Sequence, residues 1–192
     1  MLTQNTAWRN VERAMAALRD AGMLDPDAIV AAPDEELAAA IRPSGYFRVK
    51  ARRLKAVCTG WREAGGAAGL SRLSTPALRE YLLDLHGVGR ETADDIVLYG
   101  FHRPVFVVDA YTDRILGRYG WLTHRPGYEG LRRRLESALP APAAAYQRHH
   151  AQIVALGKDH CRAEPRCSAC PVGDICARHG VDGDPKARSR TQ

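Results

Sequence analysis

Apolar residues recur at helical spacing along almost the whole chain, whereas the alternating pattern of a half-buried strand is nearly absent. Near the N-terminus, four apolar residues share one face of a predicted helix that stops at Gly22: Trp8, Val11, Met15 and Leu18. The stretch "PVFVVDAY" at 104–111 is the one short β-branched run. The pattern therefore predicts an all-α fold.

Helix start signals divide the rest of the chain. Asp25 and Pro26 are residue types expected at an N-cap and a first helical position, and Ser74 or Thr75 precedes Pro76 in the same way. With the apolar spacing, these signals predict helices over about 26–32, 34–41, 46–64, 76–84, 90–101, 127–139 and 143–157.

The helix expected over 46–64 combines an apolar face with many cations. We predict that its inward face carries Val49, Leu54, Val57 and Trp61. Its other faces then carry five basic residues: Arg48, Lys50, Arg52, Arg53 and Lys55. These cations are therefore expected away from the inward face.

Composition and charge narrow the class of protein. The chain has 192 residues, of which 45% are apolar, and this suits one domain or two small ones. A net charge of +6 and a pI near 9.3 favour an anionic partner such as nucleic acid, although ordinary basic enzymes share such values. No apolar run is long enough to cross a membrane and the N-terminus has no hydrophobic signal core, so we expect a cytosolic protein with no membrane partner.

A glycine-rich connection, "LHGVG", separates the helices expected over 76–84 and 90–101. Gly87 and Gly89 permit a sharp turn and a close approach of the backbone to another molecule, while Leu85 and Val88 can pack into the core. Backbone amides at the start of a helix beginning near Arg90 would suit a phosphate. The alternative is a helix corner that simply needs glycine.

Five cysteines provide a second candidate chemistry, because cytosolic thiols stay reduced and serve as metal ligands or buried thiols. Cys161, Cys167, Cys170 and Cys176 follow the spacing C-x5-C-x2-C-x5-C, and thiolates so close together need a cation. Iron–sulfur and zinc are both candidates for that cation. A four-cysteine zinc site more often uses two paired C-x2-C units, and this chain has only one such unit among the four cysteines. Cys58 lies on an amphipathic helix and is expected to be an inert core thiol.

Several segments together resemble the endonuclease III superfamily of helix-hairpin-helix DNA glycosylases. "LHGVGRETADDIVLYGFHRPVFVVDAYTDRILGRYG" (85–120) is similar to the superfamily's hairpin and aspartate loop, and "HHAQIVALGKDHCRAEPRCSACPVGDIC" (149–176) to its iron–sulfur end. "LTQNTAWRNVERAM" and "RPSGYFRVKARRL" resemble its early and middle helices. The likeness covers about residues 1–178. "QNTAW" and "GRETAD" are most similar to the branch that includes bacterial 3-methyladenine DNA glycosylases.

The resemblance implies an organisation as well as a fold. It implies a helical barrel domain over 1–125, with the helix-hairpin-helix at about 76–101, and a C-terminal helical domain with a [4Fe–4S] cluster over 126–180. We expect a flexible basic tail over 181–192. The segment that usually precedes "LTQNT" in the superfamily is missing, so we expect either a naturally short form or an internal start.

The resemblance also implies roles for residues. Asp109 would be the catalytic carboxylate; the residue alone favours a helix N-cap, a role that does not exclude catalysis, and the glycine turn at the matching distance favours catalysis. Gln4 would fill the gap left by a flipped base. Hairpin and loop residues would contact DNA phosphates: Leu85, Gly87, Val88, Gly89, Arg90, Arg162 and Arg166. Aromatic candidates for the base pocket are Trp8, Tyr46 and Phe47, although each is expected in the core rather than in a pocket wall. The cluster ligands would be Cys161, Cys167, Cys170 and Cys176.

Glu91 departs from the endonuclease III pattern. It occupies the position of the Schiff-base lysine, and a carboxylate cannot form an imine with an abasic site. Glu91 also simply suits a first helical turn. We expect Asp94 and Asp95 to lie on a solvated acidic face or to be further partners of the helix dipole, rather than extra catalysts. His149 and His150 are expected to make packing and polar contacts between helices rather than to bind metal.

Taken together, the sequence predicts a monomeric, cytoplasmic and nucleoid-associated base-excision-repair DNA glycosylase. It would hydrolyse the N-glycosidic bond of alkylated bases in double-stranded DNA with a water nucleophile activated by Asp109, and without a lysine-dependent lyase step. The alternatives are an endonuclease III-like glycosylase for oxidised pyrimidines or mismatched bases, and a truncated DNA-binding relative without catalysis.

Overall fold

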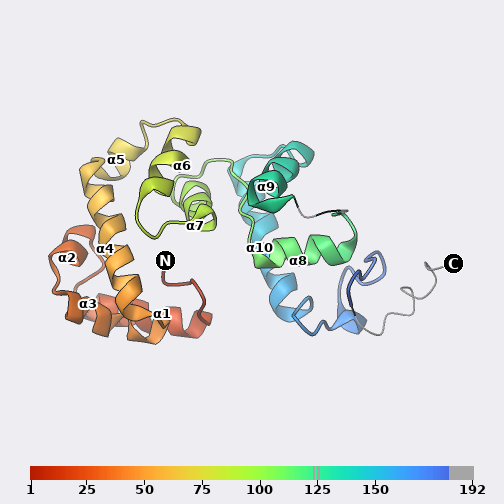
Figure 1. Ribbon diagram of the computed structural model, residues 1–192, viewed down its shortest axis with the longest axis horizontal. Helices are drawn as coiled ribbons and strands as arrows, with labels where there is room; N and C mark the ends of the chain where they lie inside the picture. The colour runs from red at the N-terminus through yellow and green to blue at the C-terminus, as the bar shows by residue number, and fades with distance from the viewer. Residues whose placement is uncertain (123, 125, 182–192) are drawn as a thin grey trace. The chain divides into compact units, whose positions relative to one another are not determined.

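The computed structural model describes residues 1–122, 124 and 126–181 (Figure 1). Within those residues every regular element is helical and no strand occurs, which confirms the predicted all-α fold. Backbone packing divides the chain into two compact units, Met1–Ala93 and Asp94–Gln192. The barrel domain expected over 1–125 and the cluster domain expected over 126–180 stay predictions. The tail expected over 181–192 lies, apart from Val181, outside the described residues.

Unit 1 follows the predicted order of helices. It contains α1 (Trp8–Asp20), α2 (Pro26–Ala31), α3 (Asp34–Ala40), the 3-10 turn η1 (Arg42–Ser44), α4 (Phe47–Glu63), α5 (Gly66–Leu70), α6 (Thr75–Asp84) and the first part of α7 (Arg90–Asp95). The Asp25 side chain caps α2 by accepting from the amide of Asp27 at 2.8 Å. Ser74, rather than Thr75, caps α6 by accepting from the Ala77 amide. Both starts thus arise from side-chain capping.

The core of unit 1 corrects the predicted face of α1. Val11 and Leu18 are buried, together with Ala14, but Trp8 is 61% exposed and Met15 is 44% exposed. The buried stripe is narrow, and Met15 lies at its edge. Trp8 is the first residue of the helix, where side chains lean toward the N-terminus and project beyond the packed turns.

The inward face of α4 also differs from the prediction. Val49 is 37% exposed, whereas Lys50, expected on the outer surface, is 2% exposed. The Lys50 Nζ donates to three backbone carbonyls, those of Leu2 at 3.0 Å, Gln4 at 2.7 Å and Ser44 at 2.6 Å. Burial lowers the pKa of Lys50. Three carbonyl acceptors offset the desolvation of the ammonium. Those of Leu2 and Gln4 join the N-terminal segment to α4, and that of Ser44 joins η1 to α4.

Unit 2 has a separate apolar core. It contains the end of α7, the π-helical segment η2 (Ile96–Gly100), α8 (Ala110–Tyr119), α9 (Gly127–Ala138), α10 (Ala143–Asp159) and the 3-10 turn η3 (Cys167–Ala169). Its buried cluster includes Leu98, Phe106, Leu131 and Tyr146. The ring centroids of Phe106 and Tyr146 are 5.4 Å apart in an edge-to-face arrangement.

The predicted helix over 90–101 changes its winding halfway. It is α-helical to Asp95 and π-helical from Ile96 to Gly100, and the Phe101 amide donates to the Ile96 carbonyl at 3.2 Å. Single π turns inside helices are frequent at functional sites. Here the π segment contains Tyr99, whose hydroxyl contacts His150 of α10.

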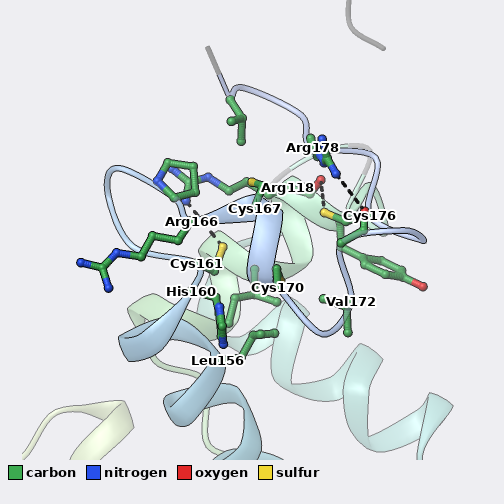
Figure 2. A pocket seen from close by; sticks show the side chains of 15 residues that line it. Arg118, Leu156, His160, Cys161, Arg166, Cys167, Cys170, Val172, Cys176 and Arg178 are labelled. Atoms are coloured by element: carbon green, nitrogen blue, oxygen red, sulfur yellow. Dashed lines mark hydrogen bonds between the residues drawn. The ribbon is translucent and has the colours of Figure 1, made fainter. Parts of the chain in front are cut away.

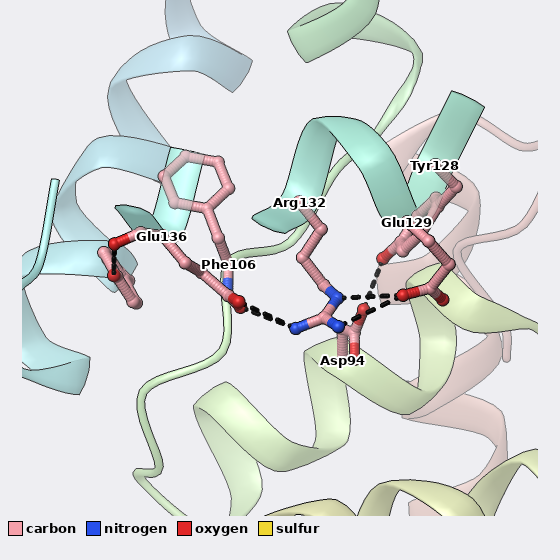
Figure 3. Close-up of polar contacts among 7 residues, drawn as sticks. Asp94, Phe106, Tyr128, Glu129, Arg132 and Glu136 are labelled. Atoms are coloured by element: carbon pink, nitrogen blue, oxygen red, sulfur yellow. Dashed lines mark hydrogen bonds and ion pairs between the residues drawn. The ribbon is translucent and has the colours of Figure 1, made fainter. Parts of the chain in front are cut away.

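A network of charged groups in unit 2 holds the extended segment that leads into α8 (Figure 3). Arg132 binds Glu129 at 3.1 Å and Glu136 at 2.8 Å, and Glu136 also accepts from the Phe106 amide at 2.9 Å. Asp94 is fully buried and accepts from the Tyr128 hydroxyl at 2.7 Å. The expectation of a solvated Asp94 was wrong, because tertiary packing supplies this carboxylate with a donor.

The Lys50 contacts lead to a test of stability. Lys50→Met keeps the aliphatic stem but leaves three buried carbonyls without their donor, so we expect the free energy of unfolding to fall by about 3 kcal/mol. Arg52→Met removes an exposed cation from the same helix and should change it by less than about 0.5 kcal/mol. Urea unfolding followed by circular dichroism measures both. Equal stability of the two variants would contradict this role.

Candidate active site

Asp109 is the N-cap of α8 and uses one carboxylate oxygen for that purpose. Its Oδ1 accepts from the Thr112 amide and from the Thr112 hydroxyl, both at 2.7 Å, and the Asp109 amide donates back to Thr112 Oγ1 at 3.4 Å. This reciprocal capping box fixes the side-chain rotamer. Capping was the alternative interpretation of Asp109, and it leaves the second oxygen, Oδ2, available for another contact.

The second oxygen faces a histidine of α10. His150 Nε2 lies 3.8 Å from Asp109 Oδ2, and the two side chains are 13% and 10% exposed. On the other side of the imidazole, His150 Nδ1 lies 2.8 Å from the Tyr99 hydroxyl of η2. The predicted polar contact of His150 between helices is therefore present.

Burial and contacts act in opposite directions on the Asp109 carboxyl. Burial alone would raise its pKa, but the contact with His150 and the hydrogen bonds from Thr112 outweigh burial and hold the pKa below its ordinary value. Asp109 is thus an anion in a mostly buried place. Such a group can stabilise developing positive charge nearby.

A neighbouring carboxyl, Asp95, has the opposite tendency. Burial raises its pKa, and the nearby negative charges of Asp109 and Asp94 act in the same direction while His150 opposes them. Asp95 is half-buried rather than on a solvated face, which corrects the expectation from the sequence. Two carboxyls around one imidazole therefore differ in their preferred charge states.

The glycine-rich turn lies in unit 1 and has two unlike glycines. Gly87 has φ +85°, and a Cβ there would meet Arg53 Cγ at 2.2 Å. Gly89 has open space beside it, and its carbonyl accepts from the Ala93 amide at the start of α7. Val88 is 7% exposed and fixes the turn in the core, as predicted. Gly87 is required by the fold, whereas Gly89 leaves the backbone accessible.

Gln4 is held within unit 1 from both ends of its amide. Its Nε2 donates to Thr92 Oγ1 at 3.0 Å, and its Oε1 accepts from Arg53 Nη1 at 3.4 Å. Leu85 is half-buried beside Gly60, where an added Cβ would meet it at 2.4 Å. The sequence analysis placed Arg53 among the cations of α4 but gave it no role at the site, whereas in the structure it contacts Gln4 and lies against Gly87.

The other predicted DNA-facing and pocket residues differ in exposure. Arg90 and Glu91 are exposed at the start of α7. Tyr46 is 74% exposed in a left-handed backbone conformation with φ 46°, so it is not a core residue, and neither is Trp8. Phe47 is half-buried and packs against the unit 1 core. Two of the three aromatic candidates are therefore available to a ligand.

The four clustered cysteines line one pocket of unit 2 (Figure 2). Two polar atoms in its wall, His160 Nδ1 and Arg178 Nε, are buried without a hydrogen-bond partner within the described part of the chain. In the same part of the chain, no three His, Cys, Asp or Glu side chains are arranged to hold a metal ion. Cys58 lies elsewhere, and burial, followed by the charge of Asp25, raises its pKa to about 11, as suits an inert core thiol.

Arg118 of α8 connects that pocket to the rest of unit 2. Its guanidinium donates to the carbonyls of Arg162 and Ala163 and lies 3.5 Å from Cys161 Sγ, while its own carbonyl lies 3.5 Å from Cys176 Sγ. Arg162 and Arg166 are exposed on this loop. Arg118 was not identified from the sequence, because nothing in the spacing of α8 shows which loop it contacts.

Comparisons with known proteins agree on one family. The family described as "HhH-GPD superfamily base excision DNA repair protein" matches residues 1–141. A Methanocaldococcus jannaschii protein assigned to the DNA repair glycosylases is 38% identical over 179 residues, which cover 92% of this chain and 81% of that protein.

Two solved structures are also similar. A crystal structure of an H. pylori 3-methyladenine DNA glycosylase bound to 1,N6-ethenoadenine is 29% identical, with a TM-score of 0.66 over 80% of this chain and 79% of that one. A trapped covalent intermediate of endonuclease III with DNA is 25% identical, with a TM-score of 0.77 over 100% of this chain and 82% of that one. Within its described residues, the present chain has no helix long and apolar enough to span a membrane.

The contrast between the two glycines gives a test. Gly87→Ala places a Cβ against Arg53 and forces an unfavourable φ, so we expect it to lower the free energy of unfolding by about 2 kcal/mol. Gly89→Ala meets open space and should cost less than about 1 kcal/mol. Denaturant unfolding of the two variants provides the comparison. A larger loss for Gly89→Ala would show that the turn has a different conformation.

Proposed function

The chain belongs to the HhH-GPD superfamily of base excision DNA repair proteins and is a DNA glycosylase, and we propose that it releases alkylated bases from double-stranded DNA by hydrolysis, as a monomer and without a lyase step. The observation that carries the proposal is the mostly buried Asp109, whose contacts keep its carboxyl ionised. Asp109 is the catalytic residue in this proposal.

Asp109 acts on the sugar of the flipped nucleotide. A base inside the duplex stack is inaccessible, so the nucleotide is extruded before the reaction. As the bond between C1′ and the base nitrogen breaks, the sugar gains positive charge, and the Asp109 carboxylate stabilises it. Water then adds to C1′, and Asp109 accepts the proton that this water loses as the new C–O bond forms. The products are the free base and an abasic site.

The proposed base pocket uses exposed aromatic side chains. Trp8 and Tyr46 present large apolar surfaces to solvent, and Phe47 lies next to Tyr46 in the chain. An N3-alkylated purine carries positive charge, so it is attracted to the face of an aromatic ring and leaves readily. The 3-methyladenine glycosylase relative, solved with an ethenoadenine base, supports an alkylated purine as the substrate.

Contacts to the DNA backbone are proposed for both units. In unit 1, the hairpin residues Leu85 to Arg90 would receive a phosphate at the accessible backbone beside Gly89. Gln4 would occupy the gap left by the extruded base, and its amide is already oriented by Arg53 and Thr92. In unit 2, Arg162 and Arg166 would contact phosphates.

The cysteine loop fits a [4Fe–4S] cluster in the chemistry of its donors. Four thiols line one pocket, and the buried Arg178 Nε–H in its wall needs an acceptor of the kind that an anionic, sulfide-rich group offers. The residues that would hold the cluster are Cys161, Cys167, Cys170 and Cys176. A bound cluster would fix the loop conformation and thereby the position of its arginines.

The proposed substrate is tested by base release from defined duplexes. We expect the protein to release 3-methyladenine from methylated DNA, and Asp109→Asn to abolish release while keeping the fold, because asparagine caps a helix as well as aspartate. Chromatography of the released bases and binding of the lesion duplex measure the two properties. Release of thymine glycol or uracil instead would favour the oxidised-pyrimidine or mismatch alternative, and binding without any release would favour a non-catalytic relative.

The cluster proposal has its own experiment. Purified protein should be yellow-brown and contain iron and sulfide, and Cys170→Ser should remove both, because the site loses one of four ligands. Cys58→Ser is the matched control, since this thiol is buried outside the loop. Metal analysis and visible absorption provide the measurements. Stoichiometric zinc in a colourless, folded and active preparation would refute the proposal.

The absence of a lyase step is tested at Glu91. Wild-type protein should leave abasic sites uncleaved, and borohydride should trap no covalent adduct, because reduction captures only an imine. Glu91→Lys supplies an amine at the position where the resemblance locates the lyase nucleophile, and we expect weak trapping and strand cleavage. Glu91→Gln, which supplies no such amine, should give neither. Efficient trapping by the wild-type chain would overturn the monofunctional assignment.

A further inference from the structure

His150 has no role in the mechanism proposed above, yet both of its ring nitrogens have specific partners. Nε2 faces Asp109 Oδ2 at 3.8 Å and Nδ1 faces the Tyr99 hydroxyl at 2.8 Å. The imidazole is 13% exposed. An imidazole placed between the mostly buried Asp109 carboxylate and the Tyr99 hydroxyl can control the charge and the orientation of that carboxylate.

Tyr99 determines which nitrogen faces Asp109. Its hydroxyl lies 3.5 Å from the carbonyl of Gln147, which is one turn before His150 on α10, and its ring centroid is 5.8 Å from that of His150. If the hydroxyl donates to Gln147, its oxygen accepts from Nδ1–H of His150, and the ring is held with Nε2 toward Asp109. The π-helical winding of η2 brings Tyr99 to this position.

Asp109 needs such a partner because its other interactions are not charged. Its Oδ1 accepts from Thr112 and is occupied by helix capping, whereas Oδ2 has His150 as its contact. Burial favours the neutral carboxyl, and the contact with His150 is the largest of the contributions that oppose burial, ahead of the hydrogen bonds from Thr112.

We propose that His150 is a positioning residue for Asp109, and that its imidazole, oriented by Tyr99, keeps the carboxylate charged and directs Oδ2. The effect of His150 on base release rests on the proposed catalytic role of Asp109. The effect of His150 on the charge of Asp109 does not depend on that role.

The charged and titratable groups around this contact come from each element packed there. Asp95 at the end of α7 attracts the same imidazole and repels Asp109, Asp94 lies beside it, and Tyr99 belongs to η2. Because burial raises the pKa of Asp95, its carboxyl is protonated at a higher pH than that of Asp109. As the pH falls, Asp95 therefore becomes neutral first, and Asp109 remains the anion that His150 contacts.

The direct test follows the Asp109 carboxyl by NMR. In full-length protein with 13C-labelled aspartate, the Asp109 signal is assigned by its loss in Asp109→Asn and titrated with pH. We expect His150→Gln to shift the Asp109 midpoint upward, because the imidazole contact that opposes the effect of burial is lost. Tyr99→Phe keeps the histidine but releases Nδ1, and it should shift the midpoint in the same direction by less. Unchanged midpoints in folded His150→Gln and Tyr99→Phe would overturn the proposal.

His149→Gln is the matched control, since it removes the neighbouring imidazole of α10, which has no hydrogen bond or ion pair with Asp109, Tyr99 or Asp95 among the described residues. It should leave the Asp109 midpoint unchanged, and an equal shift in His149→Gln and His150→Gln would also overturn the proposal. Base release in single-turnover experiments should decline at a higher pH in His150→Gln than in wild-type protein. If Asp109→Asn remained active, the catalytic assignment would fail while the NMR titration would still decide the role of His150.

Discussion

Unit 2 depends on one mostly buried carboxylate, that of Asp109, whose two oxygens have different partners. Oδ1 of Asp109 is occupied by the capping box of α8, so the rotation of the carboxyl is fixed by the helix that follows it. Oδ2 then has a single direction, toward His150 of α10. The other contacts serve this arrangement, because Glu136 holds the preceding segment at the Phe106 amide and Tyr99 orients the imidazole.

Unit 1 depends on a buried cation in a comparable way. Lys50 connects the N-terminal segment to α4 through the carbonyls of Leu2 and Gln4, and it also binds the Ser44 carbonyl of η1. Arg53, one turn later on α4, contacts the Gln4 amide and covers Gly87 of the glycine turn. One helix thus positions both candidate DNA-contacting features of unit 1. In each unit, a group that is costly to bury is retained where it fixes the geometry of a candidate site.

Local sequence signals predicted the helices and most of the candidate residues. Capping residues, proline positions and apolar spacing are short-range properties, so the order of the main helices, the N-caps at Asp25 and Ser74 and the burial of Val88 agree with the structure. The π-helical end of the helix after Arg90 was not predicted, because the winding depends on packing around it and not on residue type.

The sequence by itself determined the family, the all-α architecture and the identity of the chemical groups: one aspartate beginning a helix, a glycine turn and four clustered cysteines. Only the tertiary structure decided which polar groups became partners. Lys50 was expected away from the inward face and is buried, and the polar contact expected of His150 between helices is with Asp109. The physical reason is that charge pairing and burial depend on residues far apart in the chain, whose approach no local periodicity encodes.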